Sequence, residues 1–170
     1  MFVANEFKRK GLEYLIRAVS LLASHRIRLL VIGNDRPGEY ITLSRKLKIS
    51  DKVIFIGQSC EMIKYYASCD IFVLPTSYEP FGLVITEAMA SGLPVIVSQL
   101  AGAAELIHNM ENGLLLTDYR NPNEIAFLIL QLMDSNKRRK LGLMARKRVE
   151  EFTWEEMSRK VSDLYRDVLV

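Results

Sequence analysis

The most constraining feature of the chain is a series of short apolar runs that alternate with segments of helical periodicity. The runs are continuous, as over residues 53–56, and do not alternate between apolar and polar positions. Continuous runs are typical of strands buried on both faces, which occur in parallel sheets covered by helices. The repeated order of strand and helix therefore predicts an α/β fold, with a doubly wound parallel sheet and helices on both faces.

The pattern predicts where the individual elements lie. Strands are expected at 2–4, 28–33, 52–57, 70–75 and 93–97, with a shorter one at 114–116. Helices are expected at 11–23, 39–47, 62–68 and 82–91, and the chain after Asn121 is expected to be helical except near 151–153. Thr153 and Glu156 have the spacing of a capping box that opens the last helix. We find no linker or repeat and predict one domain over residues 1–170.

The amino-acid composition indicates the class of protein but not its ligand. Hydrophobic residues make up 49% of the chain and charged residues 25%, which is typical of a soluble globular domain. No apolar run reaches the roughly 18–20 residues that span a bilayer. No basic-then-apolar leader is visible either, so we expect a cytoplasmic protein.

The net charge of +3 favours anionic ligands in general. Basic residues are concentrated at 137–140 and 146–148. The expected role of these residues is to form the solvated face of a late helix, and a peripheral contact with the inner face of an anionic membrane stays open. Nucleic acid is not expected as a partner, because no aromatic residues interleave with these charges as a stacking platform would require.

All strand-to-helix loops of such a sheet lie at its carboxyl edge, where ligands bind. The first of these loops carries Lys8, Arg9 and Lys10, directly before Gly11 and a helix. Fixed positive charge beside the free N–H groups of a helix N-terminus suits a phosphate. The alternative is a turn with solvated basic residues.

The loop after the fourth strand places a glycine-opened helix start between two carboxylates. Gly82 lets the backbone approach a ligand, and the N–H groups of Gly82 and Leu83 are expected to point at an anion. A carboxylate within about 4 Å of a phosphate repels it by roughly 1–4 kcal/mol. We therefore expect Glu79 and Glu87 to accept hydrogen bonds from hydroxyls on either side of it, on a sugar and a ribose respectively. The alternative is one glutamate that caps the helix and another in a helix salt bridge.

Several common nucleotide sites are missing from the sequence. It contains no GxGxxG fingerprint, no Walker A loop and no DxD pair of carboxylates. We therefore expect neither a bound cofactor nor a metal. The phosphate groups of a ligand would instead be bound by the cations of the first loop and by the helix start at Gly82. Together the two loops predict a nucleotide sugar, whose diphosphate lies between two sets of hydroxyls.

The segment from Glu79 to Glu87 reads EPFGLVITE and continues as AMASGLPV. With two glutamates separated by seven residues, it resembles the retaining group 1 (family 4) glycosyltransferases of GT-B fold. Lys10-Gly11, the NGLL segment at 112–115 and the FTW segment at 152–154 match the same family. The resemblance covers residues 1–165. It implies a Rossmann-like domain that forms one half of a GT-B fold, the C-terminal half that binds the nucleotide-sugar donor.

The resemblance also implies roles for individual residues. The implied donor-binding set is Arg9, Lys10, Gln58, Glu79, Phe81, Gly82, Leu83 and Glu87. Lys10 and Arg9 would hold the diphosphate together with the backbone of Gly82 and Leu83, and Lys10 and Glu79 would belong to the catalytic centre. Glu79 would contact the donor sugar, and Glu87 would contact the ribose. Phe81 would line the sugar pocket, and the loop around Gln58 would meet the base.

One position departs from the family pattern, because Asn5 stands where many members carry an arginine. Arg9 would compensate, and its Arg-Lys-Gly context resembles the lipopolysaccharide-core glucosyltransferases, which favours UDP-glucose or a related UDP-sugar as donor. The acceptor would be a glycan or a lipid-linked hydroxyl, bound by an N-terminal domain that we expect to be absent from this chain. The last helix resembles the one that crosses back to that domain. Two alternatives stay open: a nucleotide-sugar epimerase of the same fold and a non-catalytic nucleotide-sugar-binding module.

Overall fold

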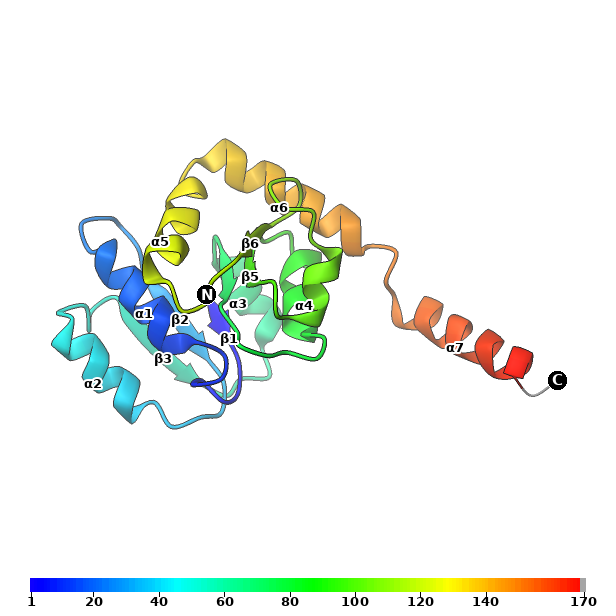
Figure 1. The fold of residues 1–170 in the computed structure, drawn as a ribbon, viewed down its shortest axis with the longest axis horizontal. Coiled ribbons are helices and arrows are strands. Elements are labelled where there is room, and N and C mark those ends of the chain that lie inside the picture. The colour runs from blue at the N-terminus through cyan, green and yellow to red at the C-terminus, as the bar shows by residue number, and fades with distance from the viewer. Residues whose placement is uncertain (169–170) are drawn as a thin grey trace.

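Six short strands form the centre of the molecule in the computed structural model, which describes residues 1–168 (Figure 1). They are β1 (Phe2–Val3), β2 (Leu29–Ile32), β3 (Val53–Gly57), β4 (Phe72–Leu74), β5 (Val95–Ser98) and β6 (Leu114–Leu116). Two parallel sets, β1-β2-β3 and β4-β5-β6, meet where the Val73 N–H donates to the Met1 carbonyl at 2.9 Å. The resulting order, β3-β2-β1-β4-β5-β6, is that of a doubly wound dinucleotide-binding sheet and confirms the predicted fold class.

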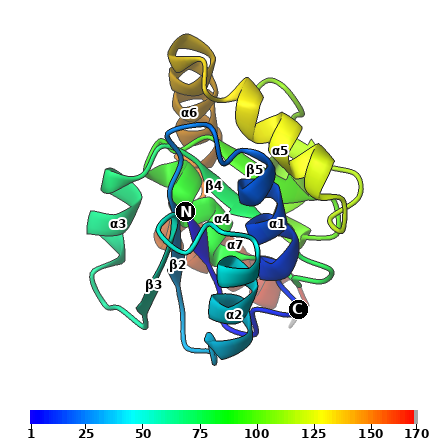
Figure 2. The same cartoon turned by 90° about the vertical axis from the view of Figure 1, so that its left-hand side faces the viewer.

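Helices cover both faces of these strands. They are α1 (Leu12–Leu21), α2 (Gly38–Lys46), α3 (Met62–Ser68), α4 (Leu83–Ala90), the 3-10 helix η1 (Gly102–Leu106), α5 (Pro122–Gln131), α6 (Ser135–Val149) and α7 (Trp154–Val168). Among the helices, α1 contacts α2 and α5. A separate pair is formed by α4 and α6. Figure 2 shows α1, α2 and α5 on one side of the strands and α3 on the other.

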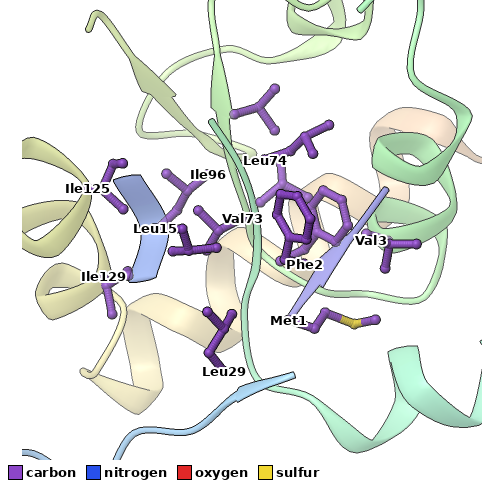
Figure 3. Packing of buried hydrophobic residues seen from close by; sticks show 14 of the residues in the cluster. Met1, Phe2, Val3, Leu15, Leu29, Val73, Leu74, Ile96, Ile125 and Ile129 are labelled. Atoms are coloured by element: carbon purple, nitrogen blue, oxygen red, sulfur yellow. The ribbon is translucent and has the colours of Figure 1, made fainter. Parts of the chain in front are cut away.

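The core lies where β1 and β4 pass side by side. Phe2, Leu74 and Ile96 on the strands are fully buried, and Leu15 of α1 belongs to the same buried cluster (Figure 3). Burial of each such side chain contributes roughly 1.5–3 kcal/mol. This packing fixes β1 beside β4, and therefore also places the loops that follow these two strands next to each other.

The predicted burial of β3 is wrong. Ile54 is 37% exposed and Ile56 is 36% exposed, although the sequence pattern predicts that both faces of this strand are covered. The physical reason is the position of β3 at the edge of the sheet, where it pairs with β2 alone among the described strands. A continuous apolar run indicates a strand but not the place of that strand in the sheet.

Two details of the C-terminal helices also differ from prediction. The expected continuous helix after Asn121 is interrupted at 132–134, where Asp134 caps α6 by accepting from the Lys137 N–H at 2.7 Å. At the start of α7 only half of the capping box is present. The Thr153 hydroxyl accepts from the Glu156 N–H at 3.2 Å, but the Glu156 carboxylate pairs with Arg159.

Helix α7 projects away from the rest of the molecule (Figure 1), and none of its residues is buried. Its apolar residues, such as Met157, Val161 and Leu164, are exposed. None of the helices in residues 1–168 is both long and apolar enough to cross a membrane.

Candidate functional site

The loops after β1 and β4 are joined at the backbone carbonyl of Arg9. This carbonyl accepts from the N–H and the hydroxyl of Ser77, both at 3.0 Å, and from the Thr76 hydroxyl at 3.4 Å. Thr76 is fully buried, and its hydroxyl also bonds the backbone of Tyr78. The two loops therefore meet at the carboxyl edge of the sheet, as predicted from the strand order.

Lys10 and Glu79 are brought together across this junction. The Lys10 ammonium lies 2.5 Å from a Glu79 carboxylate oxygen and 3.1 Å from the Tyr78 carbonyl. The Lys10 side chain is buried and that of Glu79 is 18% exposed. A buried ammonium requires a partner of opposite charge. Glu79 provides that charge and still has surface that a ligand can reach.

Gly82 connects this ion pair to the start of α4. As the N-cap it has φ +99°, and a Cβ at this position would lie 2.9 Å from Glu79 Cγ. Within residues 1–168, the N–H groups of Gly82 and Leu83 have no protein acceptor. Free N–H groups at a helix start attract anions. We call these two N–H groups together with the Lys10 ammonium the candidate anion site.

The loop after β5 fixes the loop that carries Glu79. The Gly102 N–H donates to the Glu79 carbonyl at 2.9 Å, and the Ala103 N–H donates to the Phe81 carbonyl at 2.7 Å. A Cβ on Gly102 would come within 2.0 Å of the Pro80 carbonyl oxygen. The strand order predicts that this loop lies at the ligand edge, but the sequence predicts no role for it. The available signal was a glycine followed by two alanines, four residues after the end of a buried strand.

An open hollow of about 630 Å³ lies between these loops, lined by residues that include Glu79, Gly102 and Glu105. A larger hollow of about 920 Å³ lies at the opposite edge of the sheet, near Arg28, Asp51 and Ile71. We assign function to the smaller one, because it lies at the carboxyl ends of the strands and is lined by Glu79, whereas the larger one lies at the amino edge.

Arg9 is engaged within its own loop. Its guanidinium lies 2.6 Å from the Glu6 carboxylate, donates to the Tyr78 carbonyl at 3.0 Å and lies over the Tyr78 ring. The ion pair with Arg9 lowers the pKa of Glu6, and the same pair raises the pKa of the guanidinium. Arg9 is thus beside the candidate anion site, but its charge already has a partner.

The start of α1 has fewer free N–H groups than the sequence predicts. The N–H groups of Lys10, Gly11 and Leu12 donate to the carbonyls of Glu6, Lys8 and Phe7. Gly11 has φ +76° and lies so close to Pro75 that a Cβ would come within 2.0 Å of its carbonyl oxygen. The first loop therefore folds back on itself, and among its polar groups the Lys10 ammonium is the one directed at Glu79.

The remaining predicted residues lie farther out. Phe81 is 45% exposed beside Gly82, whereas Gln58 is exposed at the end of edge strand β3, with no hydrogen bond to the candidate anion site in the part of the chain described. Asn5, at the position that departs from the family pattern, accepts from the Asn34 N–H at 2.8 Å. It joins the loops after β1 and β2.

Glu87 is exposed on α4 and has a hydrogen-bond partner that the sequence does not predict. The buried hydroxyl of Tyr66, on α3, donates to one oxygen of its carboxylate at 2.8 Å. Burial, reinforced by this bond, raises the pKa of Tyr66 well above its usual range.

Comparison with known proteins identifies the family. Residues 1–148 match the family model for group 1 glycosyl transferases. An uncharacterised glycosyltransferase of Methanocaldococcus jannaschii is 34% identical over 98% of this chain and 44% of its own length. The sucrose-phosphate synthase of Thermosynechococcus elongatus, at 33% identity, has a TM-score of 0.89 over 99% of this chain and 45% of that chain.

A second solved structure, Anabaena HepE in complex with UDP-glucose, has a TM-score of 0.90 over 98% of this chain and 48% of that chain. At 23% identity it shows a shared fold. The chain therefore spans less than half the length of each of these proteins. With the family model matched over most of its length, it belongs to the group 1 glycosyltransferases.

Proposed function

We propose that this chain is the donor-binding, C-terminal domain of a retaining glycosyltransferase whose N-terminal domain binds the acceptor. The observation that carries the proposal is the contact of Lys10 with Glu79 beside the free N–H groups of Gly82 and Leu83. The family match and the partial coverage of the relatives support it.

In the proposed complex, the donor diphosphate lies on the candidate anion site. The Lys10 ammonium and the two N–H groups stabilise the charge that develops on the diphosphate as the bond from the sugar C1 to the phosphate oxygen breaks. The acceptor hydroxyl oxygen then bonds C1 with its anomeric configuration retained, its proton passes to the departing diphosphate oxygen, and the nucleoside diphosphate leaves. We assign this stabilisation to protein groups without a metal, and expect Arg9 to join them by exchanging Glu6 for a phosphate oxygen.

The two ends of the donor are assigned to opposite sides of that site. The sugar lies in the hollow that Glu79 lines, where the partly exposed carboxylate can accept hydrogen bonds from its hydroxyls, and we assign the nearby Phe81 to the sugar pocket. The nucleoside extends along α4 toward Glu87, with its base near Gln58. The Arg-Lys-Gly sequence and the UDP-glucose complex of the structurally similar HepE both favour a UDP-sugar.

Calorimetry of the chain with UDP, UDP-glucose, GDP-mannose and uridine tests this proposal. We expect UDP and UDP-glucose to bind with similar affinity, and uridine to bind at least about 100-fold more weakly, since the charged hydrogen bonds to the diphosphate are lost. Tighter binding of GDP-mannose than of UDP-glucose would overturn the UDP assignment. Absence of binding by every nucleotide would overturn the donor-binding function.

We further propose that α6 contacts an anionic membrane surface from the cytoplasmic side, which suits an enzyme acting on a lipid-linked glycan. Arg139, Lys140 and Lys147 are exposed on this helix and pair with no acidic side chain in residues 1–168. Leu143, 67% exposed, lies between them in the sequence. Anionic headgroups attract such exposed cations, and an exposed leucine can enter the interface.

Replacing Arg139, Lys140 and Lys147 together by glutamine should weaken binding to vesicles of phosphatidylglycerol and phosphatidylcholine by about 100-fold, at about 1 kcal/mol per cation. Sedimentation with vesicles measures the change. The matched control replaces three cations of α7 that pair with acidic neighbours: Arg159, Lys160 and Arg166. An equal loss in the control would show that net charge alone is responsible and would contradict the assignment to α6.

A further inference from the structure

A buried tyrosine on α3 is bonded to the glutamate that we assign to the ribose. Tyr66 is 3% exposed, and its hydroxyl donates to Glu87 Oε2 at 2.8 Å across the boundary between α3 and α4. Glu87 itself is exposed, so its carboxylate can also be reached by a ligand. The bond joins a group inside the protein to a group on the candidate binding surface.

The bond restricts what the Glu87 carboxylate can do. An exposed glutamate on a helix samples several rotamers, and a hydrogen bond from a fixed donor favours those that keep one oxygen on Tyr66. Burial and the neighbouring carboxylate raise the Tyr66 pKa, which keeps the phenol protonated and able to donate at neutral pH. Glu87 is left with Oε1, and with the remaining lone pair of Oε2, for a ligand.

The position of Glu87 along α4 suits a ribose. It follows Leu83 by four residues, which corresponds to about 6 Å along the helix axis from the candidate anion site. In a nucleoside diphosphate, the ribose hydroxyls are separated from the diphosphate by a distance of this order. A carboxylate held at this place can accept from both hydroxyls of a vicinal diol, since it offers acceptors only.

We infer that Tyr66 is a positioning residue that holds Glu87 in the rotamer that reads the ribose diol, and so makes the site selective for ribonucleotides over 2′-deoxyribonucleotides. This inference rests on the proposed donor-binding function. It assigns to Tyr66 no contact with the substrate, and its effect is exerted through Glu87.

The test compares UDP with 2′-deoxy-UDP by calorimetry in the wild-type chain and in Tyr66→Phe. The wild type should prefer UDP by at least about tenfold, the effect of one hydrogen bond to a charged acceptor. In Tyr66→Phe the affinity for UDP should fall by about tenfold and that for 2′-deoxy-UDP should change little, so that the preference disappears. Tyr65→Phe is the matched control, because Tyr65 is the adjacent residue of α3 and its hydroxyl makes no hydrogen bond in the described structure.

The outcomes separate this inference from the proposal beneath it. If the wild type binds no UDP, the donor-binding function is wrong. If it binds UDP but Tyr66→Phe weakens both nucleotides by the same factor, or keeps the preference, Tyr66 is only a packing residue and the inference is overturned. Glu87→Gln provides a second variant that leaves Tyr66 in place. It should also abolish the preference, and combining it with Tyr66→Phe should cause no further loss.

Discussion

Replacing Lys10 by alanine should reduce the affinity of the chain for UDP by at least about 100-fold and leave its affinity for uridine unchanged. The ammonium is buried beside the free N–H groups of α4, where a charge interacts with a phosphate more strongly than it does in water. Calorimetry with the two ligands measures the two affinities separately. Equal weakening of UDP and uridine would contradict the assignment of Lys10 to the diphosphate.

The same substitution removes the partner of Glu79, so its effect on stability has to be measured as well. Breaking a buried ion pair costs up to about 3–5 kcal/mol, and the partial exposure of Glu79 places the expected loss at the lower end. Lys10→Ala combined with Glu79→Gln should recover stability in urea denaturation without recovering diphosphate affinity. Lys8→Ala is the matched control, since Lys8 is an exposed cation of the same loop, and it should change UDP affinity by less than about threefold.

Replacing Gly102 by alanine should reduce both stability and UDP affinity, although Gly102 is assigned to no part of the donor. The added Cβ would lie 2.0 Å from the Pro80 carbonyl oxygen, so the backbone of one loop has to move. That movement breaks the bonds from Gly102 and Ala103 to the carbonyls of Glu79 and Phe81. We expect a loss of about 1–3 kcal/mol in the free energy of unfolding, as for an overpacked core position, and at least about tenfold weaker binding of UDP.

Gly38→Ala is the control for this prediction. Gly38 begins α2, and a Cβ there would meet nothing within 4 Å. Alanine should stabilise the helix or leave it unchanged. If Gly102→Ala kept both wild-type stability and wild-type UDP affinity, η1 would have no part in fixing the Glu79 loop.

The strands and the order of elements were predictable because they depend on local apolar patterns. The runs at β2, β4 and β5 needed no knowledge of their partners to be recognised. The exposure of Ile54 and Ile56 was not predictable, since it depends on the position of β3 at the edge of the sheet. Periodicity describes one element at a time, whereas burial depends on neighbours.

The meeting of the loops at the candidate site was predictable from the sequence, whereas two side-chain contacts beside the site were not. The loop of Lys10 and the loop of Glu79 were expected to meet because both follow strands of one parallel sheet. The pairing of Arg9 with Glu6 was not expected. It arises within a turn in which Glu6 has φ +58°, an unusual conformation for a residue other than glycine. The bond from Tyr66 to Glu87 joins separate helices, and no local pattern contains both residues.

The most direct test of the central claim is a titration of the isotopically labelled chain with UDP, followed by the amide signals in two-dimensional NMR. If the diphosphate binds where we propose, the Gly82 and Leu83 amide signals shift strongly and saturate with the dissociation constant found by calorimetry. If those two signals stay unchanged while signals around Arg28 and Asp51, at the opposite edge of the sheet, shift instead, the diphosphate binds elsewhere and the proposed site is wrong.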